Sequence, residues 1–209
     1  MFYDPRVDVR PKPLTHNPLN ALIAPRPIGW IGSISKDGLE NLAPFSYFNA
    51  FSADPVIVGF APNSKLADGT PKDTLANIRE TGEFTASIVS RSLAGQMNRS
   101  SCDLDRGASE FEFAGLASAP SKAVKAPRVA KARAVLECVV FEIVALPGTS
   151  GGRQSHLILG EVVGIYIDDA LIVDGKIDIL ELAPVARLGY FDYSVVTETF
   201  EMKRPGQSK

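Results

Sequence analysis

The chain contains few of the residues that usually build metal centres and disulfide frameworks. It has two cysteines and two histidines among 209 residues, and no two of them stand at the spacing of a zinc ligand pair. Two cysteines are also too few for a disulfide scaffold. We therefore expect no metal site. We expect Cys138, which stands in an apolar run, to be a reduced core residue.

A long uncharged apolar run is also missing. The stretch 134–146 is interrupted by Glu137 and Glu142, and no segment reaches the roughly 18 apolar residues that a membrane span needs. The first residues do not show a basic segment followed by an apolar one, which predicts that there is no signal peptide. A cytoplasmic protein without membrane contact is the expectation.

Neither an excess of basic residues nor a local catalytic motif is present. Lysine plus arginine number 22 and aspartate plus glutamate 24, a net charge of −2 that argues against a nucleic-acid partner. The chain has no G-x-G-x-x-G loop, no P-loop and no G-x-S-x-G elbow. Nucleophilic hydrolases and dinucleotide-binding folds built on a glycine-rich loop therefore have no local support.

What the sequence does contain is the composition of one globular domain. Hydrophobic residues make up 45% of the chain and charged residues 22%, which allows a sizeable core. Five prolines among the first 25 residues predict an extended arm rather than a folded unit. We expect an arm over 1–25, one domain over 26–194 and a C-terminal tail over 195–209.

Runs of apolar residues, several of them alternating with polar ones, predict six strands. They span 27–35, 41–48, 56–61, 83–89, 133–146 and 155–168. Glycine-containing turns, in which glycine supplies a positive φ, are expected at 36–38, 147–152 and 174–175.

Between the strands, only short helices are expected. One covers 73–82, where Asp73 or Thr74 would cap the start and Gly82 the end, and another covers 90–98. Residues 99–131 read as an irregular excursion over the surface. Because no regular helices separate the strands, a doubly wound parallel sheet is disfavoured. A mainly β fold, an antiparallel Greek-key barrel with a few added helices, fits better.

Two of the expected strands carry residues that are unusual for strands. Gly29 and Gly32 lie in the first, where glycine leaves room for another backbone or for a flat ligand; a bulge or a barrel corner accounts for them equally well. Pro44 lies in the second and places it at a sheet edge or at a bend. Polar groups of 41–49 could then face a ligand, or could simply cap a distorted strand.

Two further sites stand at the ends of elements. Lys72, Asp73 and Thr74 begin a helix, and free amides, a hydroxyl and an ammonium group there suit a phosphate. An ordinary helix start with a solvated lysine is the alternative. His156 begins the last long strand and is of interest only if the barrel places it against a cofactor.

Taken together, these segments resemble the flavin reductase-like family of FMN-binding split-barrel proteins. The resemblance extends from about residue 25 to about residue 193 and rests on the order of its motifs. They are Arg26-Pro27-Ile28-Gly29-Trp30-Ile31-Gly32-Ser33, Asn41-Leu42-Ala43-Pro44-Phe45-Ser46-Tyr47-Phe48-Asn49, Lys72-Asp73-Thr74, Asn77-Ile78, Thr81-Gly82-Glu83-Phe84, Ser109-Glu110-Phe111, His156-Leu157-Ile158-Leu159-Gly160-Glu161-Val162 and Arg187-Leu188-Gly189. Family members often read Arg-Leu-Gly-Gly where this chain has Tyr190 in the fourth position, which would narrow the opening at the flavin ring.

The resemblance implies a six-stranded antiparallel split barrel that forms a homodimer, with one FMN per subunit near the subunit interface. By similarity, the isoalloxazine ring and the ribityl chain would be lined by Trp30, Ile31, Gly32, Ser33, Asn41, Leu42, Ala43, Pro44, Ser46 and Asn49. Ser46, Lys72 and Thr74, together with Asp73, would hold the phosphate. His156 matches the histidine that lies near the nicotinamide and the flavin in family reductases.

The activity that the resemblance implies is that of an NAD(P)H:flavin oxidoreductase. A hydride would pass from reduced nicotinamide to FMN, or to FAD as an alternative cofactor. The reduced flavin would then serve free flavin, another acceptor or a partner monooxygenase. Arg26 and Arg187 are candidate contacts for the phosphates of the nicotinamide nucleotide, or equally ion-pair residues of the fold. Two other functions stay open: a flavoredoxin-like electron carrier and a flavin-binding module without turnover.

Overall fold

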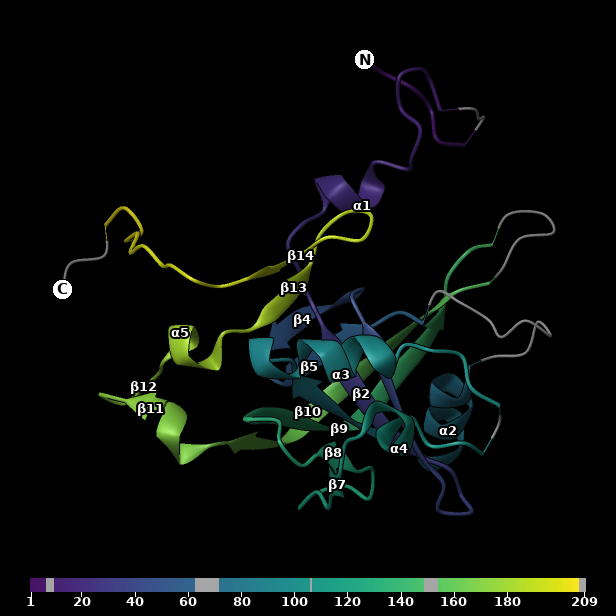
Figure 1. Cartoon of the computed structure of the whole chain (residues 1–209), viewed down its shortest axis with the longest axis vertical. Coiled ribbons are helices and arrows are strands. Elements are labelled where there is room, and N and C mark those ends of the chain that lie inside the picture. The colour runs from purple at the N-terminus through teal and green to yellow at the C-terminus, as the bar shows by residue number, and fades with distance from the viewer. Residues whose placement is uncertain (7–9, 63–71, 106, 149–153, 207–209) are drawn as a thin grey trace.

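The computed structural model describes residues 1–6, 10–62, 72–105, 107–148 and 154–206. In this part of the chain, the central sheet has seven antiparallel strands in the order β3-β2-β6-β9-β10-β5-β4 (Figure 1). The strands are β2 Gly29–Ile34, β3 Glu40–Phe45, β4 Phe48–Ala53, β5 Val56–Phe60, β6 Glu83–Ile88, β9 Ala134–Ala145 and β10 His156–Ile167. The predicted mainly β class is confirmed.

The strand expected over 41–48 is two strands in the structure. β3 ends at Phe45 and β4 begins at Phe48, so that Ser46 and Tyr47 turn the chain. Pro44 pairs with Trp30 of β2 and tolerates the edge position because it has no amide hydrogen to leave unpaired. β3 and β4 thus lie at opposite edges of the sheet although they are consecutive in sequence. The sheet must therefore curl into a barrel, and the six expected strands become seven.

One core cluster fills the barrel, because every strand of the sheet contributes a residue to it. Phe60, Phe84 and Ile158 are fully buried there. Gly160 permits the close packing, since a Cβ at this position would come within 2.5 Å of the Phe84 ring. Cys138 belongs to the same cluster, and burial raises the pKa of its thiol to about 12. The prediction that Cys138 is a core residue is confirmed.

A second core cluster covers the outside of the sheet. Trp30 and Val135 pack there against Met97 of α3 (Ala94–Arg99), Phe111 of α4 (Glu110–Ala114) and Val129. The expected surface excursion over 99–131 is therefore wrong in part. This stretch includes α4, β7 (Ser118–Ala119) and β8 (Arg128–Val129). Phe111, Ala114 and Val129 are buried whereas Phe113 is 44% exposed, and the spacing of these residues is too irregular to form a periodic pattern.

Helix α2 (Asp73–Thr81) begins differently from the prediction. Lys72, rather than Asp73 or Thr74, occupies the N-cap position, and no side chain caps the helix there. The Thr74 hydroxyl accepts a hydrogen bond from Asn41 instead. Gly82 ends the helix with φ 74°, as predicted. The helix expected over 90–98 is a 3-10 turn, η1 (Arg91–Leu93), followed by α3.

A small sheet joins the two ends of the chain. It contains β1 (Arg26–Pro27), β13 (Val185–Arg187) and β14 (Tyr193–Val195), and α1 (Leu19–Leu22) lies beside its hairpin (Figure 1). The buried Arg26 guanidinium donates to the carbonyl oxygens of Asn20 and Ile23 at 2.5 Å and of Leu188 at 2.9 Å. The last part of the expected arm is therefore fixed to the C-terminal hairpin.

The remaining elements follow β10 and precede β13 in the sequence. They are η2 (Asp169–Leu171), β11 (Ile172–Val173), β12 (Lys176–Ile177) and α5 (Ile179–Leu182). The expected turn at Asp174 and Gly175 joins β11 to β12 with positive φ at both residues. The turn expected over 147–152 lies mostly outside the described residues. None of the helices in the described ranges is long and apolar enough to cross a membrane.

Candidate functional site

A buried network of polar side chains holds β2, β3 and α2 together. Asn41 donates to the hydroxyl of Thr74 at 2.9 Å and to that of Ser33 at 3.3 Å. Asn77 also donates to Ser33, at 3.3 Å. All four residues are buried, and buried polar groups need such partners to avoid a large desolvation cost. The network therefore fixes the first turn of α2 against the edge of the barrel.

A hollow opens beside this network, and we call it the Lys72 cradle. Its walls are Ala43 and Pro44 of β3, the first residues of α2, the turn 100–104 and Glu110. Six of the predicted cofactor residues thus come together in one place: Asn41, Ala43, Pro44, Lys72, Asp73 and Thr74. The amides at the start of a helix and the lysine ammonium make this a place suited to an anion.

The cradle also holds acidic groups that the sequence analysis did not assign to it. Lys72 Nζ forms an ion pair with Asp103 at 3.0 Å. The carboxylate of Glu110 accepts a hydrogen bond from the amide of Leu42 at 3.2 Å. Burial raises the pKa of Glu110 above its ordinary value, and the charge of nearby Asp73 adds to the rise. Any anion in the cradle must therefore compete with Asp103 for Lys72.

The predicted strand 30–33 lies deeper than a ligand-lining segment would. Trp30, Ile31 and Ser33 are fully buried, and the indole Nε1 of Trp30 donates to Ser100 at 2.9 Å. A Cβ at Gly32 would lie 2.2 Å from the carbonyl oxygen of Pro127, so the glycine makes room for another backbone. Leu42 is equally buried. These side chains pack inside the chain, and their contact with a cofactor stays a prediction.

Ser46 and Asn49 lie in a different hollow from Lys72 and Thr74. This second hollow, of about 360 Å³, lies between the β4 region and the N-terminal arm and is mostly apolar, with Tyr47, Phe48 and Phe51 among its walls. Arg26 also lines it, with its guanidinium 5.9 Å from the centre of the Tyr47 ring. The structure places Ser46 outside the Lys72 cradle. Neither of the two hollows therefore brings Ser46, Lys72 and Thr74 together for a joint phosphate contact.

His156 lies at the start of β10, beside the last turns of α2. Its Nε2 is 2.8 Å from the guanidinium of Arg79. Because a guanidinium only donates hydrogen bonds, Nε2 must accept, which places the proton of a neutral imidazole on Nδ1. The sequence analysis assigned no role to Arg79, and no local pattern singles it out.

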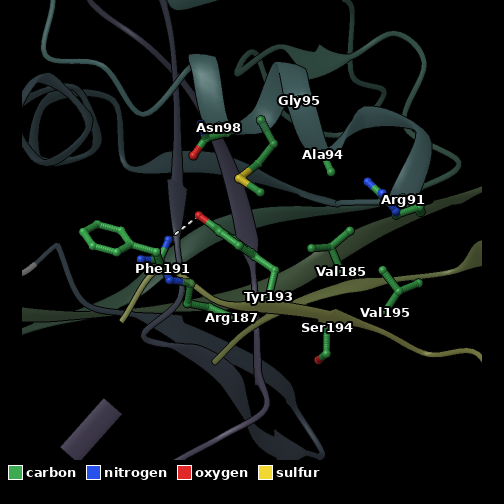
Figure 2. Close-up of a pocket in the computed structure, with 11 residues that line it drawn as sticks. Arg91, Ala94, Gly95, Asn98, Val185, Arg187, Phe191, Tyr193, Ser194 and Val195 are labelled. Carbon is green, nitrogen blue, oxygen red and sulfur yellow. Dashed lines mark hydrogen bonds between the residues drawn. The ribbon is translucent and has the colours of Figure 1, made fainter. Parts of the chain in front are cut away.

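Arg187 lines a third hollow, of about 580 Å³, between α3 and the β13–β14 hairpin (Figure 2). We call it the arginine groove; its walls are Arg91, Ala94, Gly95, Met97, Asn98, Val185, Arg187, Phe191, Tyr193, Ser194 and Val195. The Arg187 guanidinium donates to the Tyr193 hydroxyl and to the carbonyl oxygen of Tyr190, and it stacks 4.5 Å from the centre of the Tyr193 ring. Arg26 and Arg187 pair directly across β1 and β13.

Within the described part of the chain, no group of three or more histidine, cysteine, aspartate or glutamate side chains could hold a metal ion. The walls of the three hollows carry hydrogen-bond donors, cationic side chains and apolar side chains. Sequence reasoning missed the turn 100–104, Asp103 and Arg91 as wall residues, because their partners in the cradle and the groove are distant in sequence.

The comparison with family models decides the family. The model described as flavin reductase like domain matches residues 22–186 of this chain. The chain belongs to the flavin reductase-like family. A relative from Halalkalibacterium halodurans is 39% identical over 183 residues, which cover 88% of this chain and 87% of the relative.

Solved structures of similar proteins extend this result to the fold of this flavin reductase-like chain. Nitrilotriacetate monooxygenase component B from Bacillus cereus is 32% identical and has a TM-score of 0.84, with 94% of this chain and 98% of that chain covered. A Shewanella frigidimarina protein described as having a split barrel domain is 26% identical, with a TM-score of 0.76 and 89% of each chain covered. The split-barrel prediction is confirmed.

Proposed function

We propose that this protein binds FMN with its phosphate in the Lys72 cradle, whose volume of about 50 Å³ suits that group, and reduces flavin with NAD(P)H. The observation that carries the proposal is the position of Lys72 and Thr74 at the first turn of α2, directly beside Ala43 and Pro44, in a chain of the flavin reductase-like family. A phosphate there would accept hydrogen bonds from the ammonium of Lys72, from the Thr74 hydroxyl and from backbone amides at the start of the helix.

The donor set of the cradle fits a phosphate with one rearrangement. The Thr74 hydroxyl oxygen accepts from Asn41, which leaves its proton for a ligand. Lys72 is already held over the cradle by Asp103, so a phosphate would replace one anionic partner by another. Asp73, Asp103 and Glu110 oppose a dianion, and moving Asp103 away is the change that binding requires.

When bound, FMN supplies the ring that accepts the hydride, while the protein sets its position and access. In this proposal, Asn41 fixes the Thr74 hydroxyl toward the phosphate. Ala43 and Pro44 offer an apolar wall without competing donors. His156 orients the nicotinamide; its Nε2 is held by Arg79 and its Nδ1 carries the proton. FAD, whose diphosphate would take the place of the FMN phosphate, is the alternative cofactor.

We further propose that the protein is a homodimer. Phe141, Val163 and Ile165 are 61%, 45% and 60% exposed along the paired strands β9 and β10, and large apolar side chains exposed on neighbouring strands favour a covered surface. A sedimentation mass of one chain at micromolar concentration with FMN present would contradict the dimer. A partner monooxygenase is a candidate user of the reduced flavin, because the similar protein from Bacillus cereus is a monooxygenase component.

Two measurements on the purified protein test the function. An absorption spectrum, as purified and after addition of FMN, is expected to show bound flavin; without flavin bands in either case, the proposal fails. Anaerobic mixing with NADH and with NADPH in a stopped-flow instrument is then expected to bleach the bound flavin. If dithionite bleaches it and neither nucleotide does so within minutes, the electron-carrier function replaces the reductase.

A further inference from the structure

The arginine groove concentrates positive charge that the fold does not neutralise. Its walls include Arg91 and Arg187 but no aspartate or glutamate. In the described part of the chain, no ion pair joins either arginine to a carboxylate; the polar partners found for Arg187 are a hydroxyl and a carbonyl oxygen. The chain as a whole carries a net charge of −2, so this local excess of cations is not a general property of its surface.

Between the two arginines the groove is apolar. Figure 2 shows Val185 and the ring of Tyr193 between Arg91 and Arg187, with α3 along the opposite side. Met97 and Val195 complete this wall. A flat hydrocarbon ring could lie against such a surface, and Tyr193 offers a face or an edge for contact with it.

Arg187 is held in place before any ligand arrives. It stacks on the Tyr193 ring and uses two hydrogen bonds within its own hairpin, which leaves part of its five donors available. A guanidinium that is already oriented loses less conformational entropy when it binds a carboxylate or a phosphate. The volume of about 580 Å³ lies within the range of small-molecule sites.

We propose that the arginine groove is a binding site for a small aromatic anion, that is, a flat ring that carries a carboxylate or a phosphate. The site is separate from the Lys72 cradle. An aromatic carboxylic acid there goes beyond the proposed flavin chemistry, whereas a nucleotide there rests on the proposed function, because Arg187 is the expected contact for the nicotinamide nucleotide. Helix α3 and the residues that follow it divide the two, because Met97 and Asn98 face the groove whereas Ser100 and Ser101 line the cradle. An aromatic carboxylic acid and a nucleotide are the two sources of this chemistry.

The methionines of the chain allow a local test of binding. There are three; Met97 lines the groove, while Met1 and Met202 are 79% and 80% exposed near the two ends. Protein labelled with ¹³C on the methionine methyl groups is titrated with benzoate and, separately, with adenosine 5′-monophosphate. We expect a saturable shift of the Met97 signal with at least one of them, while the signals of Met1 and Met202 stay in place. The anion that produces the shift identifies the source.

Charge and location are then tested by matched variants. Arg91→Gln should weaken binding about tenfold, because a charged partner is lost. Arg204→Gln, an exposed arginine outside the groove, and Lys72→Ala in the cradle should leave the titration unchanged. The neutral analogues benzyl alcohol and adenosine should bind at least about tenfold more weakly. The proposal is overturned if neither anion moves Met97, if the neutral analogues bind as well, or if the Arg91→Gln titration equals that of the wild type.

Discussion

The side-chain amide of Asn41 donates a hydrogen bond of 2.9 Å to the hydroxyl oxygen of Thr74. This contact joins β3, an edge strand of the barrel, to the first turn of α2. Thr74 does not cap its own helix, because it lies two positions after the N-cap residue Lys72. The geometry of the Lys72 cradle therefore depends on Asn41, which is also one of its lining residues.

Replacing Asn41 by alanine removes this contact and the one to Ser33. Both partners are buried, so the loss should lower the free energy of unfolding by about 1–3 kcal/mol. Denaturant titration measures it. Asn49→Ala is the control, because Asn49 is exposed and its side chain accepts a hydrogen bond from the adjacent amide of Ala50; its effect should stay within about 0.5 kcal/mol. Equal losses in the two variants would contradict the network.

The ion pair between Lys72 and Asp103 predicts opposite effects of two substitutions on FMN binding. Lys72→Ala should weaken it about ten- to hundredfold, because a charge-assisted contact to the phosphate is lost. Asp103→Asn should strengthen it or leave it unchanged, since the ammonium then has no carboxylate to release. Quenching of FMN fluorescence measures both affinities. An unaltered affinity in Lys72→Ala would make this lysine a surface residue of the fold.

Two glycines predict opposite effects on stability. Gly32→Ala places a methyl group 2.2 Å from the carbonyl oxygen of Pro127, a backbone atom that cannot move aside, and should destabilise the fold by more than about 2 kcal/mol. Gly95→Ala meets nothing within 4 Å in α3 and should stabilise it by up to about 1 kcal/mol. Thermal unfolding of both variants gives the comparison, and a tolerated Gly32→Ala would refute the close approach.

Burial of Glu110 predicts a pH-dependent contribution to stability. Its pKa in the folded protein is raised above the ordinary value near 4.5, so the folded state keeps the proton to a higher pH than the unfolded chain does. Stability from this group therefore falls as the pH rises from the ordinary value through the raised one. Glu110→Gln keeps an oxygen for the Leu42 amide and has no charge to bury. The unfolding temperature of this variant minus that of the wild type should increase from about pH 4 to about pH 7, the range in which carboxyl groups titrate. A difference that stays constant over this range would contradict the assignment.

His156 and Arg79 predict a kinetic effect without a loss of cofactor. His156→Ala should slow reduction of bound flavin by NAD(P)H and leave FMN bound, because the ring is proposed to orient the hydride donor. Arg79→Gln removes the charged partner of Nε2 and should slow the same step less, about tenfold or below. Stopped-flow bleaching gives the rates, and FMN fluorescence gives the bound fraction. Equal rates in His156→Ala and wild type would leave the histidine without a role in catalysis.

The barrel could be predicted from the sequence because its strands carry local signals. Gly82 at the end of α2 and the pair Asp174-Gly175 were predicted from turn chemistry and are confirmed. The split of the strand at Ser46 and Tyr47 was not predicted, because both flanking segments are apolar and the break is required by closure of the barrel. Such closure depends on pairing between distant strands, which no local window contains.

The candidate site could be predicted only in part. Lys72, Thr74, Ala43 and Pro44 do share one hollow, since each stands at the end or the edge of an element with a local signature. The roles of Asp103 and Arg79 could not be predicted, because each meets its partner across at least 31 positions of sequence. Arg26 was ambiguous in the sequence; the structure gives its guanidinium three backbone carbonyl partners rather than an ion pair, and its contact with a nucleotide phosphate stays a prediction.

The hydrogen bonds of the Arg26 guanidinium have a consequence for the order of folding. The guanidinium needs the carbonyl oxygen of Leu188, 162 positions further along the chain, and loop closure over such a distance is a slow and entropically costly step. During synthesis this joint must wait until residue 188 has left the ribosome, although the barrel strands from β2 to β6 emerge much earlier. We therefore expect the small sheet of β1, β13 and β14 to form only after its C-terminal strands have been synthesised, and a protease added during translation should cleave the N-terminal arm until that moment.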